Sequence, residues 1–401
     1  MSPTALPRVA ILSAVRTPIG RFGGSLKALS APALGSIAAK AAIGRARLAP
    51  AEIEEVLMAN GIQAGVGQNP ARQAERGAGV PDSAGAVTVN MVCGGGMKAI
   101  HLGFVSVRSG ERDRVVVGGM ESMSNAPFLV PGRMRWGTSP GPVTLTDALQ
   151  WDSLIDAYGE HEIMGLTGER IARKFGITRA EVDAFAVRSN RRAAEATASG
   201  RFSAEIEPVP AQPSLGCPGL DHDENPRADT TAEKLATFKP AFLPNGVLTA
   251  ANSSKLSDGA AALVLASEAE VQRRGLTPLA WIHSIAEGGV HPDDVMEAPI
   301  PTVRKHLDRT GLKAGEFDRI EHNEAFASAS IAVQRSFSFA DDRFNVQGGA
   351  VALGHPIGMS GARIVVTLLH EMIRAKSRLG LATICMGGGN GLSLVLDRSG
   401  L

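Results

Sequence analysis

The sequence repeats one order of elements twice: an apolar strand, a glycine-rich turn, a helix and a second apolar strand. In the first copy, Cys93 opens the turn, a helix is expected from Met97, and the next strand reaches Val117. In the second copy, Ser360 lies 24 residues before Ile384, the same separation as from Cys93 to Val117. Strand–turn–helix–strand units of this kind build layered α/β folds, so the pattern predicts two similar α/β halves.

The first copy contains the most distinctive stretch of the chain. A short buried strand is expected at 87–89, and a helix is expected from Met97 until Gly110 ends it. Its apolar positions at helical spacing are Met97, Ile100, Phe104 and Val105. In the second half, short strands are expected at 343–346 and 381–384, and the latter ends at Cys385.

Residues 124–248 interrupt this pattern. The segment starts rich in proline, glycine and arginine, continues with helical stretches, and later becomes polar with further prolines. Insertions of this length between core elements often supply a binding surface. We therefore predict a first half from 1–123 and 249–274, an inserted domain at 124–248, and a second half at 275–401.

Composition narrows the class of protein. The chain has 401 residues, a formal net charge of +1 and 4% aromatic residues, which argues against nucleic acid or an anionic membrane as the main partner. No apolar run reaches the roughly 18 residues of a membrane span. Three cysteines do not form a disulfide framework, so a reducing, cytoplasmic location is expected.

Cys93 is a candidate nucleophile. It precedes a helix, where the helix dipole favours a thiolate, and Gly94, Gly95 and Gly96 remove side chains that would hinder an acyl group. An activated thiol of this kind can serve as the nucleophile in covalent catalysis. The alternative is a small core cysteine in a glycine-rich turn.

Three further candidates follow predicted strands, where α/β sheets collect their active sites. They are Asn323, His355 between two glycines, and Cys385 before three glycines. Each has a structural alternative, a packed histidine or a small buried cysteine. No two cysteine or histidine residues have a zinc-type spacing, so no metal site is expected.

Taken together, these segments resemble the thiolase family, the acetyl-CoA acetyltransferases and 3-ketoacyl-CoA thiolases. The resemblance covers nearly the whole chain and rests on residues 90–99, 118–124, 323–327, 345–363 and 385–391. It implies a five-layer αβαβα core made of two similar halves, with an inserted loop domain. It also implies reversible Claisen condensation and thiolysis of acyl-CoA by a ping-pong route.

The resemblance implies a role for each candidate. Cys93 would carry the acyl group as a thioester, and His355 would activate the thiol. Cys385 would move the α-proton, which suits a thiol whose pKa is tuned by its surroundings. Asn323 would hold a water in an oxyanion hole with His355, and the N–H groups of Cys93 and Gly387 would form a second one.

The resemblance also implies a coenzyme A site and an assembly. Residues expected at the substrate are Arg227, Ser254, Met164, Ala325 and Phe326. Coenzyme A would be substrate and product, no metal or redox cofactor would be needed, and the protein would be a homodimer or a homotetramer built from dimers.

The chain departs from the family pattern at Gly95, where the family often has serine, and at three further positions. Ile163 replaces a histidine of short-chain members, Lys255 replaces a glycine, and His322 stands where a small or aliphatic residue is usual. Two other functions stay open at this point, a decarboxylating ketoacyl synthase-like enzyme and a catalytically silent acyl-CoA-binding protein. The cysteine at 385 and the intact catalytic set argue against them.

Overall fold

The computed structural model describes residues 7–137 and 140–401. Its main sheet has the strand order β10-β11-β12-β9-β1-β8-β5-β3-β4, with the short β2 paired to β8. The strands are β1 (Val9–Arg16), β2 (Gly20–Arg21), β3 (Glu55–Ala59), β4 (Gly85–Val89), β5 (Arg114–Ser122), β8 (Ser257–Ser267), β9 (Ala280–Gly289), β10 (Arg319–His322), β11 (Leu379–Met386) and β12 (Asn390–Asp397).

The strand pairings show the two similar halves. In the first half β3 is parallel to β5, β5 is antiparallel to β8, and β8 is antiparallel to β1. The second half repeats this order, since β10 is parallel to β11, and β12 and β9 follow antiparallel. The halves join where β1 pairs with β9. The expected fold, with two similar halves, is confirmed.

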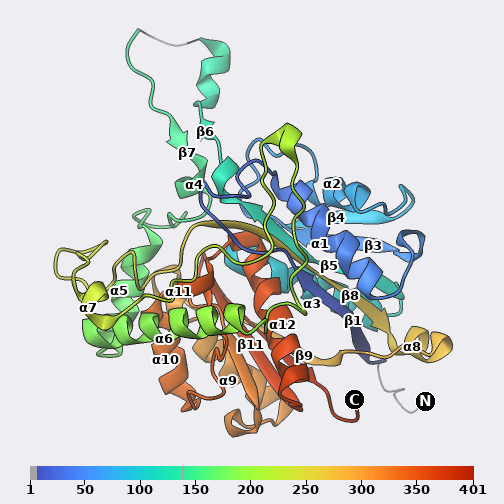
Figure 1. Cartoon of the computed structure of the whole chain (residues 1–401). Helices are drawn as coiled ribbons and strands as arrows, with labels where there is room; N and C mark the ends of the chain where they lie inside the picture. The colour runs from blue at the N-terminus through green and yellow to red at the C-terminus, as the bar shows by residue number, and fades with distance from the viewer. Residues whose placement is uncertain (1–6, 138–139) are drawn as a thin grey trace.

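Helices cover both halves and fill the space between them (Figure 1). The outer face of the first half carries α1 (Ala31–Arg45) and α2 (Pro70–Gly77). In the middle, α3 (Gly95–Arg108) packs against α12 (Ile357–Arg374), and α9 (Pro299–Thr310) covers β9 and β12. The remaining core helices are α8 (Glu268–Arg274), α10 (Ala327–Phe337) and α11 (Ala350–Leu353).

Glycines let the two central helices touch backbone to backbone. A Cβ on Gly96 would lie 2.7 Å from the backbone N of Ala362, and one on Gly361 would lie 2.5 Å from the backbone N of Met97. A Cβ on Gly94 would overlap the Met386 sulfur. The expectation that glycines 94–96 make room for an acyl group is therefore wrong, because protein atoms already fill that room.

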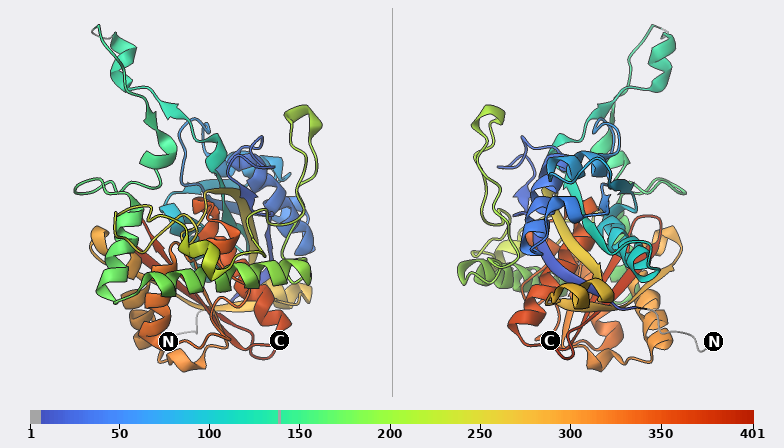
Figure 2. Two further views of the ribbon diagram at one scale, coloured as in Figure 1. Left: turned by 60° about the vertical axis from the view of Figure 1, so that its left-hand side comes forward. Right: turned by 90° about the vertical axis from the view of Figure 1, so that its right-hand side faces the viewer.

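The segment between β5 and β8 contributes α4 (Ala148–Trp151), α5 (Met164–Lys174), α6 (Arg179–Ala198) and α7 (Ala232–Ala236). An arm projects from this segment, seen at the top of Figures 1 and 2. Two short strands of the arm, β6 (Phe128–Leu129) and β7 (Thr146–Asp147), pair with each other. The boundaries that we assigned to this inserted domain stay a prediction.

Within the described residues, no helix has the length and apolar character needed to cross a membrane.

Two local expectations are wrong. Residues 87–89 form a strand as expected, but Val87 is 46% exposed because β4 is the edge strand of the sheet. The apolar positions expected in the helix all lie in α3, where Met97, Ile100 and Phe104 are buried and Val105 is 51% exposed. Residues 343–346 form no strand and make only an isolated bridge from Phe344 to Ile320.

The Gly96 contact gives a first test. Gly96→Ala should lower the free energy of unfolding by about 2 kcal/mol, because overpacking a filled core typically costs 1–3 kcal/mol. Gly44→Ala, in α1 with nothing within 4 Å of the new Cβ, is the matched control and should leave stability equal or higher. Urea unfolding followed by circular dichroism measures both. Equal midpoints for the two variants would contradict the packing argument.

Candidate active site

Cys93 lies in a 3₁₀ turn (Val92–Gly94) between β4 and α3, and this turn packs against β11. The residue as a whole is partly exposed, whereas its sulfur is buried. The backbone N–H groups of Gly387 and of Cys93 itself act on its sulfur and oppose the rise in its pKa. Gly387 directly follows β11, so a donor from the second half reaches the thiol of the first half.

Cys385 is buried near the end of β11, with its sulfur 3.8 Å from the Met296 sulfur. Negative charge on Cys93 raises the pKa of Cys385. The two thiols, one from each half of the molecule, are therefore electrostatic neighbours.

Burial decides the protonation state of both thiols. It raises the pKa of Cys93 to about 12, against the opposing effect of the two N–H donors, and raises that of Cys385 to about 12. The expectation that the helix dipole leaves Cys93 as a thiolate is wrong, because loss of hydration outweighs the dipole. Both residues are thiols at neutral pH, and each needs a base before it can react as a thiolate.

His355 lies just before α12 and is buried. Burial, reinforced by the charge of Arg363, lowers its pKa to about 3, so the imidazole is neutral. The Ser360 hydroxyl donates to the Pro356 carbonyl at 2.9 Å, and His355 Nδ1 lies 2.6 Å from the same hydroxyl oxygen. The hydroxyl can therefore accept from Nδ1–H, which assigns the proton to Nδ1 and leaves Nε2 free to take one.

Asn323 follows β10 and is fully buried. Its Nδ2 lies 3.4 Å from both ring nitrogens of His355, so the amide stands beside the imidazole. Its Oδ1 has no hydrogen-bond partner among the described residues. A buried amide oxygen without a partner is suited to hold a water or a substrate group.

Glu121 connects the first half to the loop that carries His355. Its Oε2 accepts the N–H of Gly358 at 2.9 Å and the N–H of Gly61 at 2.9 Å. Burial raises the pKa of Glu121 to about 7. In the next part of this loop, Ile357 packs in the same apolar cluster as Cys93, so His355 and Cys93 lie in one region of the molecule.

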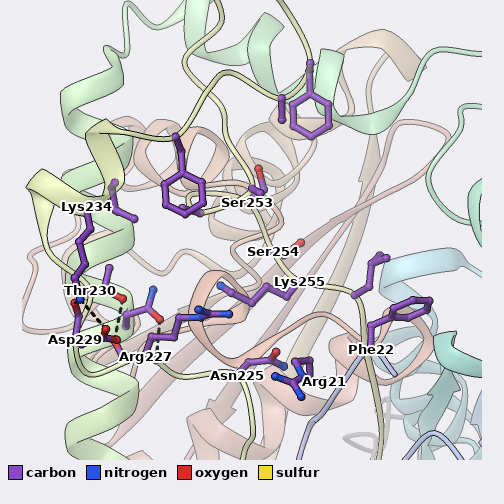
Figure 3. A pocket seen from close by; sticks show the side chains of 18 residues that line it. Arg21, Phe22, Asn225, Arg227, Asp229, Thr230, Lys234, Ser253, Ser254 and Lys255 are labelled. Atoms are coloured by element: carbon purple, nitrogen blue, oxygen red, sulfur yellow. Dashed lines mark hydrogen bonds and ion pairs between the residues drawn. The ribbon is translucent and has the colours of Figure 1, made fainter. Parts of the chain in front are cut away.

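A cavity of about 600 Å³ opens on the inserted segment (Figure 3). Arg227 and Ser254, two of the residues expected to bind coenzyme A, line it. Arg21 adds a further positive charge, which suits an anionic ligand, while Lys234 is paired with Asp229 of the same wall at 2.6 Å.

A smaller cavity of about 200 Å³ continues from this one to His355. The two share Ser254, Lys255 and Phe242, so together they lead from the surface to His355. Met164 and Phe326, also expected at the substrate, line the inner cavity. Ala325 lies beneath it, and its carbonyl accepts the N–H of Ser254 at 3.0 Å.

The three further departures from the family pattern have separate surroundings. Ile163 lines the inner cavity with an apolar side chain. His322 is a neutral core residue, since burial lowers its pKa to about 3 and its Nδ1 lies 2.8 Å from Ser330 Oγ. Lys255 lines both cavities and donates to the Val351 carbonyl, and burial lowers its pKa to about 8.

Sequence reasoning missed Phe242, which lines both cavities. Its ring meets Phe326 edge to face, with centroids 5.9 Å apart, and a Cβ on Gly165 would overlap it. One phenylalanine in a polar insertion carries no periodic signal that would identify it. Ser360 was likewise recognised only by its position in the repeat, because its contact with His355 is visible only in the fold.

Comparison with known proteins decides the family. The family model described as "Thiolase, N-terminal domain" matches residues 9–269, and "Thiolase, C-terminal domain" matches residues 276–398. The chain belongs to the thiolase family. The expected family is thereby confirmed, and the α/β halves described above are the two thiolase domains.

Similar thiolases cover the whole chain. An acetyl-CoA acetyltransferase of Pseudomonas aeruginosa is 46% identical over 391 residues, covering 97% of this chain and 99% of the relative. One of Escherichia coli is 46% identical over 389 residues, covering 97% and 98%. One of Cupriavidus necator is 44% identical over 391 residues, covering 97% and 99%.

The protonation state of this thiolase's Cys93 can be tested directly. With a pKa of about 12, its alkylation by iodoacetamide should rise about tenfold per pH unit between about pH 7 and 10, because the thiolate is the nucleophile. An ordinary cysteine, with a pKa near 8.5, levels off within this range. Peptide mass spectrometry measures the rate at Cys93, with a free cysteine peptide as control. A plateau below about pH 9 would contradict a buried thiol.

Proposed function

We propose that this thiolase-family acyltransferase catalyses reversible Claisen condensation and thiolysis of 3-ketoacyl-CoA through an acyl-enzyme on Cys93. The proposal is supported by groups from both halves of the molecule that act on one pair of thiols. The N–H of Gly387 opposes the rise in the pKa of Cys93, and charge on Cys93 raises the pKa of Cys385. The names of the relatives, acetyl-CoA acetyltransferases, support a short acyl group.

Thiolysis begins at Cys93. His355 Nε2 takes the thiol proton, and the thiolate attacks the 3-keto carbon of the substrate. The N–H groups of Gly387 and Cys93 stabilise the oxyanion that forms, and loss of one such donor typically costs about 10²–10³ in rate. The bond between C2 and C3 then breaks, which leaves the acyl group on Cys93 and the enolate of acetyl-CoA.

Cys385 completes the first half of the reaction. Its thiol donates a proton to the enolate carbon, while Asn323 and His355 support the enolate oxygen. A raised pKa keeps Cys385 protonated and ready to donate. Incoming coenzyme A gives its proton to the Cys385 thiolate and attacks the acyl-enzyme. Cys93 leaves as a thiolate and recovers its proton from His355.

Coenzyme A would lie in the outer cavity, with its phosphates near Arg227 and its pantetheine arm running past Ser254, Ala325 and Phe326 to Met164. It is substrate and product, and the mechanism uses no metal or redox group. A cytoplasmic location and a role in fatty acid metabolism stay predictions.

Three single substitutions separate the roles of the cysteines. Cys93→Ser should lower thiolysis of acetoacetyl-CoA by roughly 10³-fold or more and abolish the acyl-enzyme, as expected for a lost nucleophile. Cys385→Ala should also lose turnover but still become acetylated by acetyl-CoA, because only proton transfer at carbon fails. Cys217→Ala is the matched control, since Cys217 is buried in the apolar cluster of the first half, which contains neither Cys93 nor Cys385, and its thiol donates to the Ser25 carbonyl.

Loss of the enolate absorbance of acetoacetyl-CoA measures turnover, and intact-protein mass measures acetylation. A Cys93→Ser protein that kept turnover, or a Cys385→Ala protein with full activity, would refute the assignment.

A homodimer would bury the exposed apolar side chains on β4 and α3. Val87, Leu102 and Val105 are 46%, 38% and 51% exposed, and β4 ends the sheet with an unpaired edge. A second copy of β4 could continue the sheet across this edge. The arm would join dimers into a homotetramer, because Trp136 near its tip is 86% exposed.

Disruption of each of these two contacts should leave a different oligomer. Leu102→Asp combined with Val105→Asp should yield monomers, whereas Trp136→Asp should yield dimers, because each change places a charge in one apolar contact. Light scattering after size exclusion measures the mass. Leu215→Asp, at an exposed leucine on another projecting loop, is the control and should keep the tetramer. A wild-type protein that runs as a monomer would refute the assembly.

A further inference from the structure

A third cavity, of about 410 Å³, lies next to the inner cavity at His355 and has no role in the mechanism above. We name it the acidic cavity. Its walls include Val92 and Gly387 on one side and Trp151, Asp152, Asp156 and Tyr158 of the inserted segment on the other. Met164 lines both this cavity and the one at His355, so the two cavities adjoin at this residue.

The acidic cavity adjoins the proposed acyl carrier. Val92 is the residue before Cys93, and the N–H of Gly387 reaches the Cys93 sulfur. Gly388, which follows, has its backbone against the Tyr158 ring, where an added Cβ would lie 3.2 Å from the hydroxyl oxygen. The acidic cavity therefore starts at residues adjacent to Cys93 and, within the described residues, shares no lining residue with the outer cavity.

The loop at 155–163 is built to present Asp156 to this space. Ile155 and Ile163 form an antiparallel bridge, and the N–H of Asp156 donates to the Glu162 carbonyl at 2.8 Å. Asp156 is only 7% exposed, and its Oδ2 accepts the N–H of Tyr158 at 3.1 Å. Its Oδ1, also buried, has no hydrogen-bond partner in the described part of the chain. A buried carboxylate oxygen without a partner is costly unless a ligand satisfies it.

The chemistry of the walls is that of a cation site. Two carboxylates and two electron-rich rings line the cavity, and no lysine or arginine does so within residues 7–137 and 140–401. His161 steadies this wall, since its ring packs on Trp151 with centroids 5.3 Å apart and its Nδ1 lies 3.0 Å from the Asp156 carbonyl oxygen. Aromatic faces combined with carboxylates attract ammonium groups.

We propose that the acidic cavity receives the distal end of the acyl group on Cys93 and favours acyl groups that end in a cation. The proposal rests on the proposed function of Cys93. In the acylation step the Cys93 sulfur forms a bond to the thioester carbonyl carbon and the bond to the coenzyme A sulfur breaks. The thiol proton passes through His355 to the leaving sulfur.

Matched substrates isolate the effect of charge. 4-(Trimethylammonio)butanoyl-CoA and 5,5-dimethylhexanoyl-CoA have the same shape and differ by one positive charge. (Trimethylammonio)acetyl-CoA and 3,3-dimethylbutanoyl-CoA form a shorter pair, which tests a shorter distance between the Cys93 sulfur and the end of the acyl group. The rate of Cys93 acylation, followed by intact-protein mass on the full chain, should be at least about tenfold higher for the cation of one pair, in line with typical cation–π energies.

Variants identify the source of the preference. Asp156→Asn should bring the two rates of the favoured pair close together, and Asp152→Asn should reduce their ratio in the same direction. Asp308→Asn, at an exposed aspartate of α9 outside the cavity, is the matched control and should keep the wild-type ratio. If Asp156→Asn does not fold, the ratio of cationic to neutral acylation rates in the Asp152→Asn and wild-type proteins still tests the cation preference.

The outcomes of these experiments distinguish the proposed function from the proposed cation preference. If acetyl-CoA leaves no acetyl group on Cys93, the proposed function itself is wrong. If acetylation occurs but both pairs react at equal rates, or the neutral members react faster, the cation preference is overturned and the function stands. A preference that survives in both aspartate variants would also overturn it.

Discussion

The contact of α3 with α12 is the constraint on which the rest of the site depends. Each helix begins just after a functional residue, Cys93 in the first half and His355 in the second. Because Gly96 and Gly361 let the helix starts meet without side chains between them, both functional residues are brought to one place. The glycines therefore serve the substrate only indirectly. They determine how closely the two halves approach, and that approach directs the N–H of Gly387 at the Cys93 sulfur.

Close approach of two halves also buries the reactive groups, and burial sets their chemistry. It favours the uncharged form of each group, so both thiols stay protonated and His355 stays neutral. A neutral imidazole with Nδ1 bonded to Ser360 can accept a proton only at Nε2. These three groups are therefore uncharged at rest. In the proposed mechanism each ion forms when substrate is present and is stabilised by fixed N–H donors, which act strongly where water is excluded.

Much of this could be predicted from the sequence, and the failures have physical causes. The repeated spacing from Cys93 and Ser360 predicted two similar halves because strand and helix periods are local properties. The exposure of Val87 and Val105 could not be predicted, since an apolar residue gives the same signal in a core and at an edge that awaits a partner. The thiol state of Cys93 was misjudged because a helix dipole is visible in sequence, whereas the loss of hydration that outweighs it exists only in the folded protein.

In the proposed mechanism, the core and the inserted segment have different tasks. The core carries the reacting residues, and the inserted segment determines which substrates reach them. The duplicated core supplies Cys93, His355 and Cys385, which can act on any thioester that reaches them. Selection falls to the inserted segment, whose Met164 stands between the inner cavity and the acidic cavity. Ile163 gives the inner cavity an apolar wall, while His161 supports the acidic one. One short loop of the inserted segment thus contributes to two cavities of different polarity.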